Sequence, residues 1–135
     1  MKAGDTYIRA GKHIAADPHL WIIISDPAKD KQLVAVNVTS QRTDKDQSCV
    51  LYQGEHEFLQ KESVIMYSGA RVVLESAILS AISSGLLKRK KSISRSVLAR
   101  VRKGAVGNKN LPLNAKRILQ AQGIIPPDDA PTRTR

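Results

Sequence analysis

Short apolar runs rich in β-branched residues dominate the first half of the chain. Segments with turn chemistry separate them, among them Gly11, "DPAKDK" and "DKDQ". The predicted strands cover residues 6–10, 19–25, 32–40, 48–52 and 63–73. Because no helical pattern interrupts them, these strands favour a small antiparallel β-barrel over about residues 4–73 rather than a parallel sheet.

The strand at residues 32–40 has the clearest alternation. Val34, Val36 and Val38 alternate with a second set of residues, namely Leu33, Ala35, Asn37 and Thr39. The first set forms an apolar face, and the second becomes polar toward Thr39. We therefore expect this strand to present a hydroxyl at the surface while its valines pack in the core.

The hydrophobic period changes to that of a helix after residue 73. Apolar residues recur at helical spacing at Leu74, Ala77, Ile78, Ala81 and Ile82. Gly85 can end this helix. A second helix is predicted to begin near Ser92 or Ser94 and to end at Gly104, and a third to follow Asn114. The predicted class is α+β, with an antiparallel SH3-like barrel followed by two or three helices.

The length of 135 residues fits a single domain. We assign this domain to residues 1–123, with a helical extension over about 85–123. Residues 124–135 are predicted to be a disordered tail, since "PPDDAPTRTR" has almost no apolar side chain to bury.

Positive charge is concentrated in the second half of the chain. Residues 76–127 contain eleven Lys and Arg and no Asp or Glu, within a chain of net charge +10. Such asymmetry predicts attraction to a polyanion, most often a nucleic acid. A solvated basic face or a surface for an acidic protein remains the alternative.

Several other classes of protein lack support in the sequence. No apolar run is long enough for a membrane span or a signal peptide, so we expect a cytoplasmic protein without membrane association. The single Cys49 excludes an internal disulfide. Nucleotide-binding glycine loops and zinc motifs are missing, and Cys49 with His56 would give only two soft ligands. We predict no metal and no cofactor.

The polar residues near the predicted strand ends suggest acid–base chemistry. His13, His19 and His56 all lie beside turn signals, and Thr39 and Ser40 close the third strand. Imidazole gives and takes protons near neutral pH. Metal-independent RNA cleavage needs a base, an acid and donors to the phosphate, and these residue types would supply them. Each residue taken alone is more often an ordinary surface, turn or strand residue.

The order of four motifs resembles the PemK/MazF family of toxins. "GDTYIRA", "HLWIIIS", "VAVNVTS" and "ESVIMYSGARVV" occur in that order over about residues 4–84. Membership would imply an SH3-like barrel, a homodimer and an endoribonuclease of single-stranded RNA that an acidic antitoxin protein neutralises. The basic extension from Gly85 onward has no counterpart in the compact members of that family.

The resemblance also implies roles for individual residues. The threonine used at the RNA-cleaving centre falls on Thr39, with Ser40 beside it, and Arg71 falls on an arginine that helps to hold substrate. The family's catalytic arginine falls on His19, a departure that replaces a forked guanidinium by an imidazole.

We therefore predict a metal-independent endoribonuclease with catalytic residues His19, Thr39, His56 and Arg71. His19 and His56 are the acid and the base in either order, and Glu55 or Glu57 orients His56. The predicted RNA-binding residues are Ser40, Lys61, Lys88, Arg89, Lys90, Lys91 and Arg95. Alternatives are a non-catalytic nucleic-acid-binding module of a phage or mobile element, and an interaction domain for an acidic protein.

Overall fold

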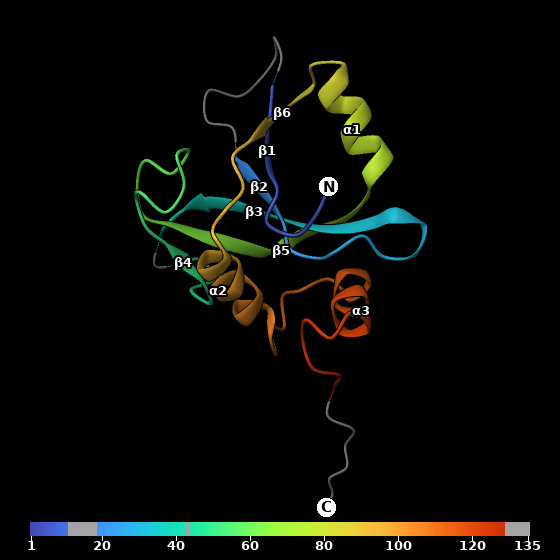
Figure 1. Cartoon of the computed structure of the whole chain (residues 1–135). Helices are drawn as coiled ribbons and strands as arrows, with labels where there is room; N and C mark the ends of the chain where they lie inside the picture. The colour runs from blue at the N-terminus through green and yellow to red at the C-terminus, as the bar shows by residue number, and fades with distance from the viewer. Residues whose placement is uncertain (11–18, 43, 129–135) are drawn as a thin grey trace, which may run out of the picture.

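A computed structural model describes residues 1–10, 19–42 and 44–128 of the chain. Six antiparallel strands form one curled sheet, a half-barrel with the order β4-β5-β3-β2-β1-β6 (Figure 1). The strands are β1 (Thr6–Arg9), β2 (Leu20–Ile23), β3 (Gln32–Ser40), β4 (Val50–Leu51), β5 (Ser63–Leu74) and β6 (Leu87–Lys90). A 3-10 turn, η1 (Lys29–Lys31), precedes β3, and the three helices are α1 (Glu75–Ser83), α2 (Arg95–Ala105) and α3 (Leu113–Ala121). The predicted α+β class with C-terminal helices is confirmed.

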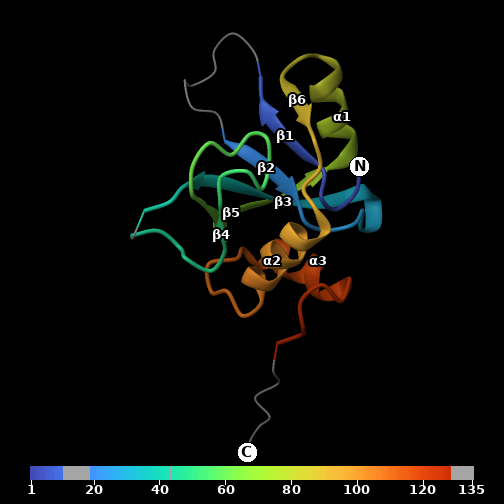
Figure 2. The same ribbon diagram turned by 60° about the vertical axis from the view of Figure 1, so that its left-hand side comes forward.

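Helices cover the sheet on two sides (Figures 1 and 2). We call the side packed against α2 and α3 the closed face; its core includes Leu20, Ile22, Val34, Val36, Val38, Val101 and Leu119. We call the other side the open face; its smaller core contains Tyr7, Ile23 and Leu33 from the sheet and Ile78 from α1. Because both faces are covered around residues 33–36, all four are buried, and the alternation of β3 becomes polar only from Asn37 onward.

The strand β6 is a feature that the sequence pattern did not predict. It pairs antiparallel with β1, with Thr6 opposite Lys90 and Ile8 opposite Lys88. Its sequence, "LKRK", has no apolar alternation because it forms an edge of the sheet, where lysines also discourage pairing with other chains. The basic run was proposed only as part of an RNA-binding surface, and most of it is a strand.

The helices of the C-terminal half begin and end close to the predicted positions. Ser94 caps α2, because its hydroxyl accepts a hydrogen bond from the backbone N–H of Val97 at 3.2 Å. Gly104 lies inside α2 instead of ending it. A Cβ atom at Gly104 would lie 2.2 Å from the Tyr67 hydroxyl oxygen, so glycine is needed there for close packing.

The packed part of the chain continues past residue 123. Ile125 is only 3% exposed and belongs to the closed-face core, so the tail does not begin at residue 124 as expected. Gly11, His13 and residues 129–135 lie outside the described residues. Across the described ranges, no helix has both the length and the apolar character needed to span a membrane.

Candidate active site

A cavity of about 430 Å³ lies where the ends of β2 and β3 meet the loop that precedes β5. This volume is within the usual range for small-ligand sites. Its lining comprises His19, Leu20, Val38, Thr39, Ser40, Glu57, Phe58, Leu59, Gln60, Lys61, Ser63 and Lys90. Five of the eleven residues predicted for the site, namely His19, Thr39, Ser40, Lys61 and Lys90, therefore line one cavity.

His19 has one ring nitrogen fixed by the backbone. Its Nδ1 lies 3.0 Å from the carbonyl oxygen of Val38. Since a carbonyl oxygen can only accept a hydrogen bond, Nδ1 carries the proton, and the neutral ring then has its lone pair on Nε2. Within the described ranges Nε2 has no hydrogen-bond partner, and the side chain is exposed. This arrangement fits a proton acceptor.

Thr39 is held by a lysine that the sequence analysis did not single out. Lys45 Nζ donates to the Thr39 hydroxyl oxygen at 3.0 Å and to the Ser40 carbonyl oxygen at 2.9 Å. Because the Thr39 oxygen accepts from Lys45, its own O–H remains available to donate to a ligand. The ammonium also places a positive charge directly behind this hydroxyl.

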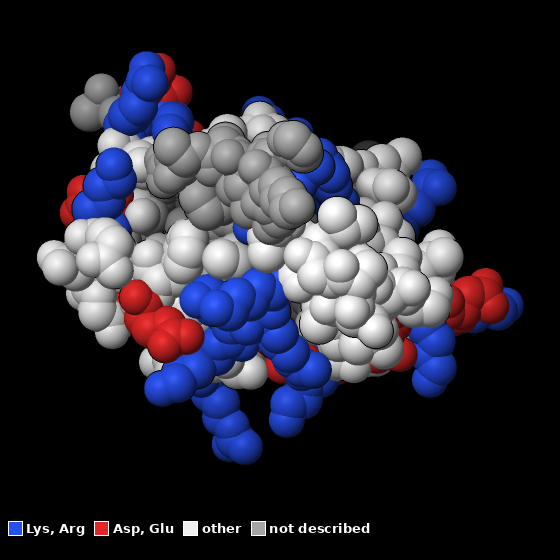
Figure 3. Space-filling view, turned by 90° about the horizontal axis from the view of Figure 1, so that it is seen from above, with Lys and Arg blue, Asp and Glu red and all other residues white. Residues whose placement is uncertain are grey.

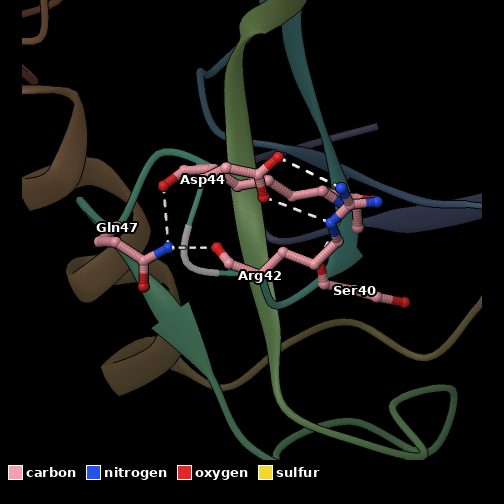
Figure 4. A network of polar contacts seen from close by, with 6 residues as sticks. Ser40, Arg42, Asp44 and Gln47 are labelled. Atoms are coloured by element: carbon pink, nitrogen blue, oxygen red, sulfur yellow. Dashed lines mark hydrogen bonds and ion pairs between the residues drawn. The ribbon is translucent and has the colours of Figure 1, made fainter.

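The loop between β3 and β4 positions Lys45 through its own polar contacts (Figure 4). The Gln47 side-chain amide donates to the carbonyl oxygens of Arg42 and Lys45, each at 2.8 Å. The Arg42 guanidinium pairs with Asp44 at 3.2 and 3.3 Å. The turn residues in the sequence predict only that a loop lies here. The contact between Lys45 and Thr39 depends on how that loop folds, so the sequence pattern did not reveal it.

Two further lysines give the cavity a positive rim. Lys61 comes from the loop before β5, and Lys90 comes from β6, a strand that is distant in sequence. Seen from the side of α1 and β6, Lys and Arg side chains gather into a band beside an area without charged residues (Figure 3). A cavity with a cationic rim suits an anion such as a phosphodiester.

His56 is buried, with 6% of its surface exposed. Its Nε2 lies 2.6 Å from the Lys91 carbonyl oxygen, to which it donates, and its Nδ1 accepts from the Phe58 N–H at 3.0 Å. Both ring nitrogens are therefore used to join the loop before β5 to the end of β6. The structure gives His56 a structural role in place of the predicted proton transfer.

Glu55 also has a partner other than His56. It forms an ion pair with Arg100 of α2, and its Oε1 accepts from the Tyr52 N–H at 2.8 Å. The hydrogen bond from Arg100 is the main cause that lowers the pKa of Glu55 below its usual value. The acidic side chain thus ties the loop to α2, and Glu57 is the neighbour that reaches the cavity.

Arg71 lies on β5, opposite Ala35, rather than in the cavity. Its guanidinium lies over the Trp21 ring at 5.2 Å from the ring centroid. The predicted role as a charge stabiliser beside Thr39 therefore has no support from this geometry.

The eleven basic residues of the second half are not all free to bind a polyanion. Arg89 donates to the buried Asp5 at 2.8 Å, Lys116 pairs with Asp128, Arg100 pairs with Glu55, and Arg102 donates to the Ile24 carbonyl oxygen. Lys88, Lys91 and Arg95 are exposed, and their side chains have no hydrogen-bond or ion-pair partner among residues 1–10, 19–42 and 44–128.

A second cavity, of about 650 Å³, lies between β4 and α2. Cys49 lines it, and burial raises the pKa of the Cys49 thiol above its usual value. The thiol is therefore protonated at neutral pH and is a poor nucleophile. Arg100, which also lines this cavity, is already ion-paired with Glu55. The second cavity therefore offers fewer groups for proton transfer or anion binding than the cavity at His19.

No protein-family model and no curated protein matches this chain. The function must therefore be argued from the site itself.

Proposed function

We propose that the protein is a toxin-like, metal-independent endoribonuclease that cleaves single-stranded RNA in the His19–Thr39 cavity. The observation that supports this most is the His19 ring, whose Nδ1–H is fixed by Val38 while Nε2 has no partner among residues 1–10, 19–42 and 44–128, in a cavity that Thr39, Lys61 and Lys90 share. A base, a hydroxyl donor and cations are the groups that this cleavage requires.

In the proposed reaction, His19 Nε2 takes the proton of a ribose 2′-hydroxyl. The 2′-oxygen attacks the adjacent phosphorus, the bond from phosphorus to the 5′-oxygen breaks, and a 2′,3′-cyclic phosphate forms. The ammonium of Lys61 or Lys90 gives a proton to the departing 5′-oxygen. Thr39 O–H, backed by Lys45, donates to a phosphate oxygen and stabilises the charge that builds up there.

We further propose that the half-barrel is an SH3-like barrel of the PemK/MazF type, acting as a homodimer in the cytoplasm with an acidic antitoxin protein. The support is the order of the sequence motifs together with an antiparallel curled sheet followed by helices.

The test is an incubation of the full chain with a single-stranded RNA transcript in excess EDTA. We expect cleavage, with products that end in 2′,3′-cyclic phosphate, and we expect Thr39→Val to reduce the rate while leaving the fold intact. Glu62→Gln, an exposed substitution just before β5, is the matched control.

A non-catalytic RNA-binding module is the second candidate. The observation in its favour is that, among the residues the structure describes, His19 is the one imidazole lining the cavity, His56 being buried elsewhere. Binding that weakens steeply with salt, without strand scission in either EDTA or Mg²⁺, would select the module and overturn the nuclease.

A further inference from the structure

Trp21 lies at the centre of a layered group of side chains on the open face. Its ring is nearly parallel to that of Tyr7, at 9° and a centroid separation of 6.4 Å. Arg71 lies over the Trp21 ring, and its side chain is exposed. Tyr7 is 5% exposed, so the order from core to solvent is Tyr7, Trp21 and Arg71. The Arg71 guanidinium thus lies at the surface with an aromatic ring beneath it, its central carbon 5.2 Å from the ring centroid.

The strand register connects this group to the candidate active site. Trp21 pairs with Asn37 across β2 and β3. Thr39 follows Asn37 by two residues on the same side of β3, which is about 7 Å along a strand. His19 lies two residues before Trp21 in the neighbouring chain segment. Arg71 itself is opposite Ala35, four residues before Thr39 on β3, so its backbone lies about 13 Å along the strand from that of Thr39.

We propose that Arg71, held on Trp21, is a stacking platform for a nucleobase of single-stranded RNA. The inference rests on the proposed function for the position of the scissile phosphate. RNA is the occupant because bases of single strands stack on aromatic rings and on Arg guanidinium planes. Charge complementarity agrees, since Arg71 is exposed, with no carboxylate partner within the described ranges.

The experiment measures binding of full-length protein to fluorescein-labelled 2′-O-methyl RNA hexamers, which cannot form a cyclic phosphate. Arg71→Lys keeps the charge but loses the plane, and Arg71→Ala loses both. We expect both variants to weaken binding by about 5- to 100-fold, the size of one base stack. A set of hexamers, each lacking the base at one position, locates the stacked base. Wild type and Arg71→Lys should bind equally well to the one hexamer that lacks this base, and should differ on the others. Full affinity in Arg71→Lys, or an equal loss on every abasic hexamer, would overturn the platform.

A second readout uses the fact that Trp21 is the only tryptophan in the sequence. Its emission should change when RNA binds, and the change should be smaller for the hexamer that is abasic at the critical position. Unchanged Trp21 emission at saturating RNA contradicts the proposal.

The outcomes separate this inference from the nuclease proposal. Binding that depends on the Arg71 plane, without any cleavage of unmodified RNA, refutes the nuclease and supports the platform. Cleavage that occurs with no effect of Arg71→Lys on binding refutes the platform alone.

Discussion

The closed face and the open face of the sheet are built from alternate residues of the same strands, yet they differ in cover and in chemistry. On β3, Val34, Val36 and Val38 enter the core beneath α2 and α3. On the opposite side, Leu33 is covered by α1, but Asn37 and Thr39 continue beyond that cover and are only partly buried. One strand thus contributes to the core along most of its length and, at its end, provides Val38, Thr39 and Ser40 to the candidate site.

This difference shows how a small domain can separate stability from function. Apolar burial contributes free energy in proportion to the area removed from water, so the face covered by two helices supplies most of it. The face with one short helix leaves polar and aromatic side chains accessible. Substitutions on the two faces should therefore change different measured quantities.

The largest expected effect is on cleavage and comes from the site at the strand ends. Replacing the base by His19→Ala should lower the cleavage rate by about 10²- to 10⁴-fold, the usual contribution of a positioned proton acceptor. Because His19 is exposed, the free energy of unfolding should stay within about 0.5 kcal/mol of wild type. RNA cleavage and urea unfolding, measured on the same sample, test both statements.

His56→Ala provides the contrasting result for a buried imidazole. It should lower the unfolding free energy by about 1–3 kcal/mol, because it leaves the Phe58 N–H without its partner and the Lys91 carbonyl with the Thr6 hydroxyl as its remaining donor. Equal loss of cleavage in the two folded variants would refute the different roles given to His19 and His56.

The next effect concerns stability on the closed face. Leu119→Ala removes a fully buried side chain of α3 and should lower the unfolding free energy by about 2–5 kcal/mol. Leu79→Ala on the exposed surface of α1 is the matched control, and it should change that energy by about 0.5 kcal/mol or less. Similar losses in both variants would mean that the two faces do not differ in their contribution to stability.

A smaller effect on activity is expected from Lys45. Lys45→Ala removes the ammonium behind the Thr39 hydroxyl and should slow cleavage by about tenfold, or about 1.4 kcal/mol of transition-state stabilisation. Cleavage at saturating RNA is the measurement, with Lys31→Ala as an exposed control of the same charge. The double variant Lys45→Ala/Thr39→Val tests whether the two residues act together. If its loss of cleavage rate equals the product of the two single losses, the residues act independently, and the observed contact has no role in cleavage.

The smallest effect is the pH dependence of the ion pair that joins the loop to α2. The hydrogen bond from Arg100 lowers the pKa of folded Glu55 below its unfolded value of 4.5, so the pair stabilises the protein above that value. This contribution, less than about 1 kcal/mol, is lost as the pH falls through the folded pKa. Unfolding measured between pH 7 and pH 3 should therefore depend on pH more strongly in wild type than in Glu55→Gln. Identical pH profiles would contradict the assignment.

The sequence supported many features of the fold that depend on local pattern. The strand at residues 32–40 was predicted with its observed bounds, and of the two expected caps, Ser92 and Ser94, it is Ser94 that caps α2. The edge strand β6 was not predicted, because its pairing with β1 depends on a partner about 80 residues away and not on its own pattern.

For the site, the sequence identified residue types but not their neighbours. His19, Thr39, Ser40 and Lys61 were proposed from strand ends and a family resemblance, and they line one cavity together. Lys45 and the layered group at Trp21 were missed, since a loop closure and a cross-strand stack leave no periodic signal in the sequence.

By itself, then, the sequence determined the antiparallel strands, the helical second half and the excess of positive charge, because period, turn residues and charge are properties of neighbouring positions. Only the tertiary structure decided that His56 is used in the interior, that Arg71 lies on Trp21, and that four basic residues of the second half are already committed to contacts within the protein. Burial and hydrogen-bond partners come from segments far apart in the chain, and they determine which titratable and charged groups remain available for chemistry.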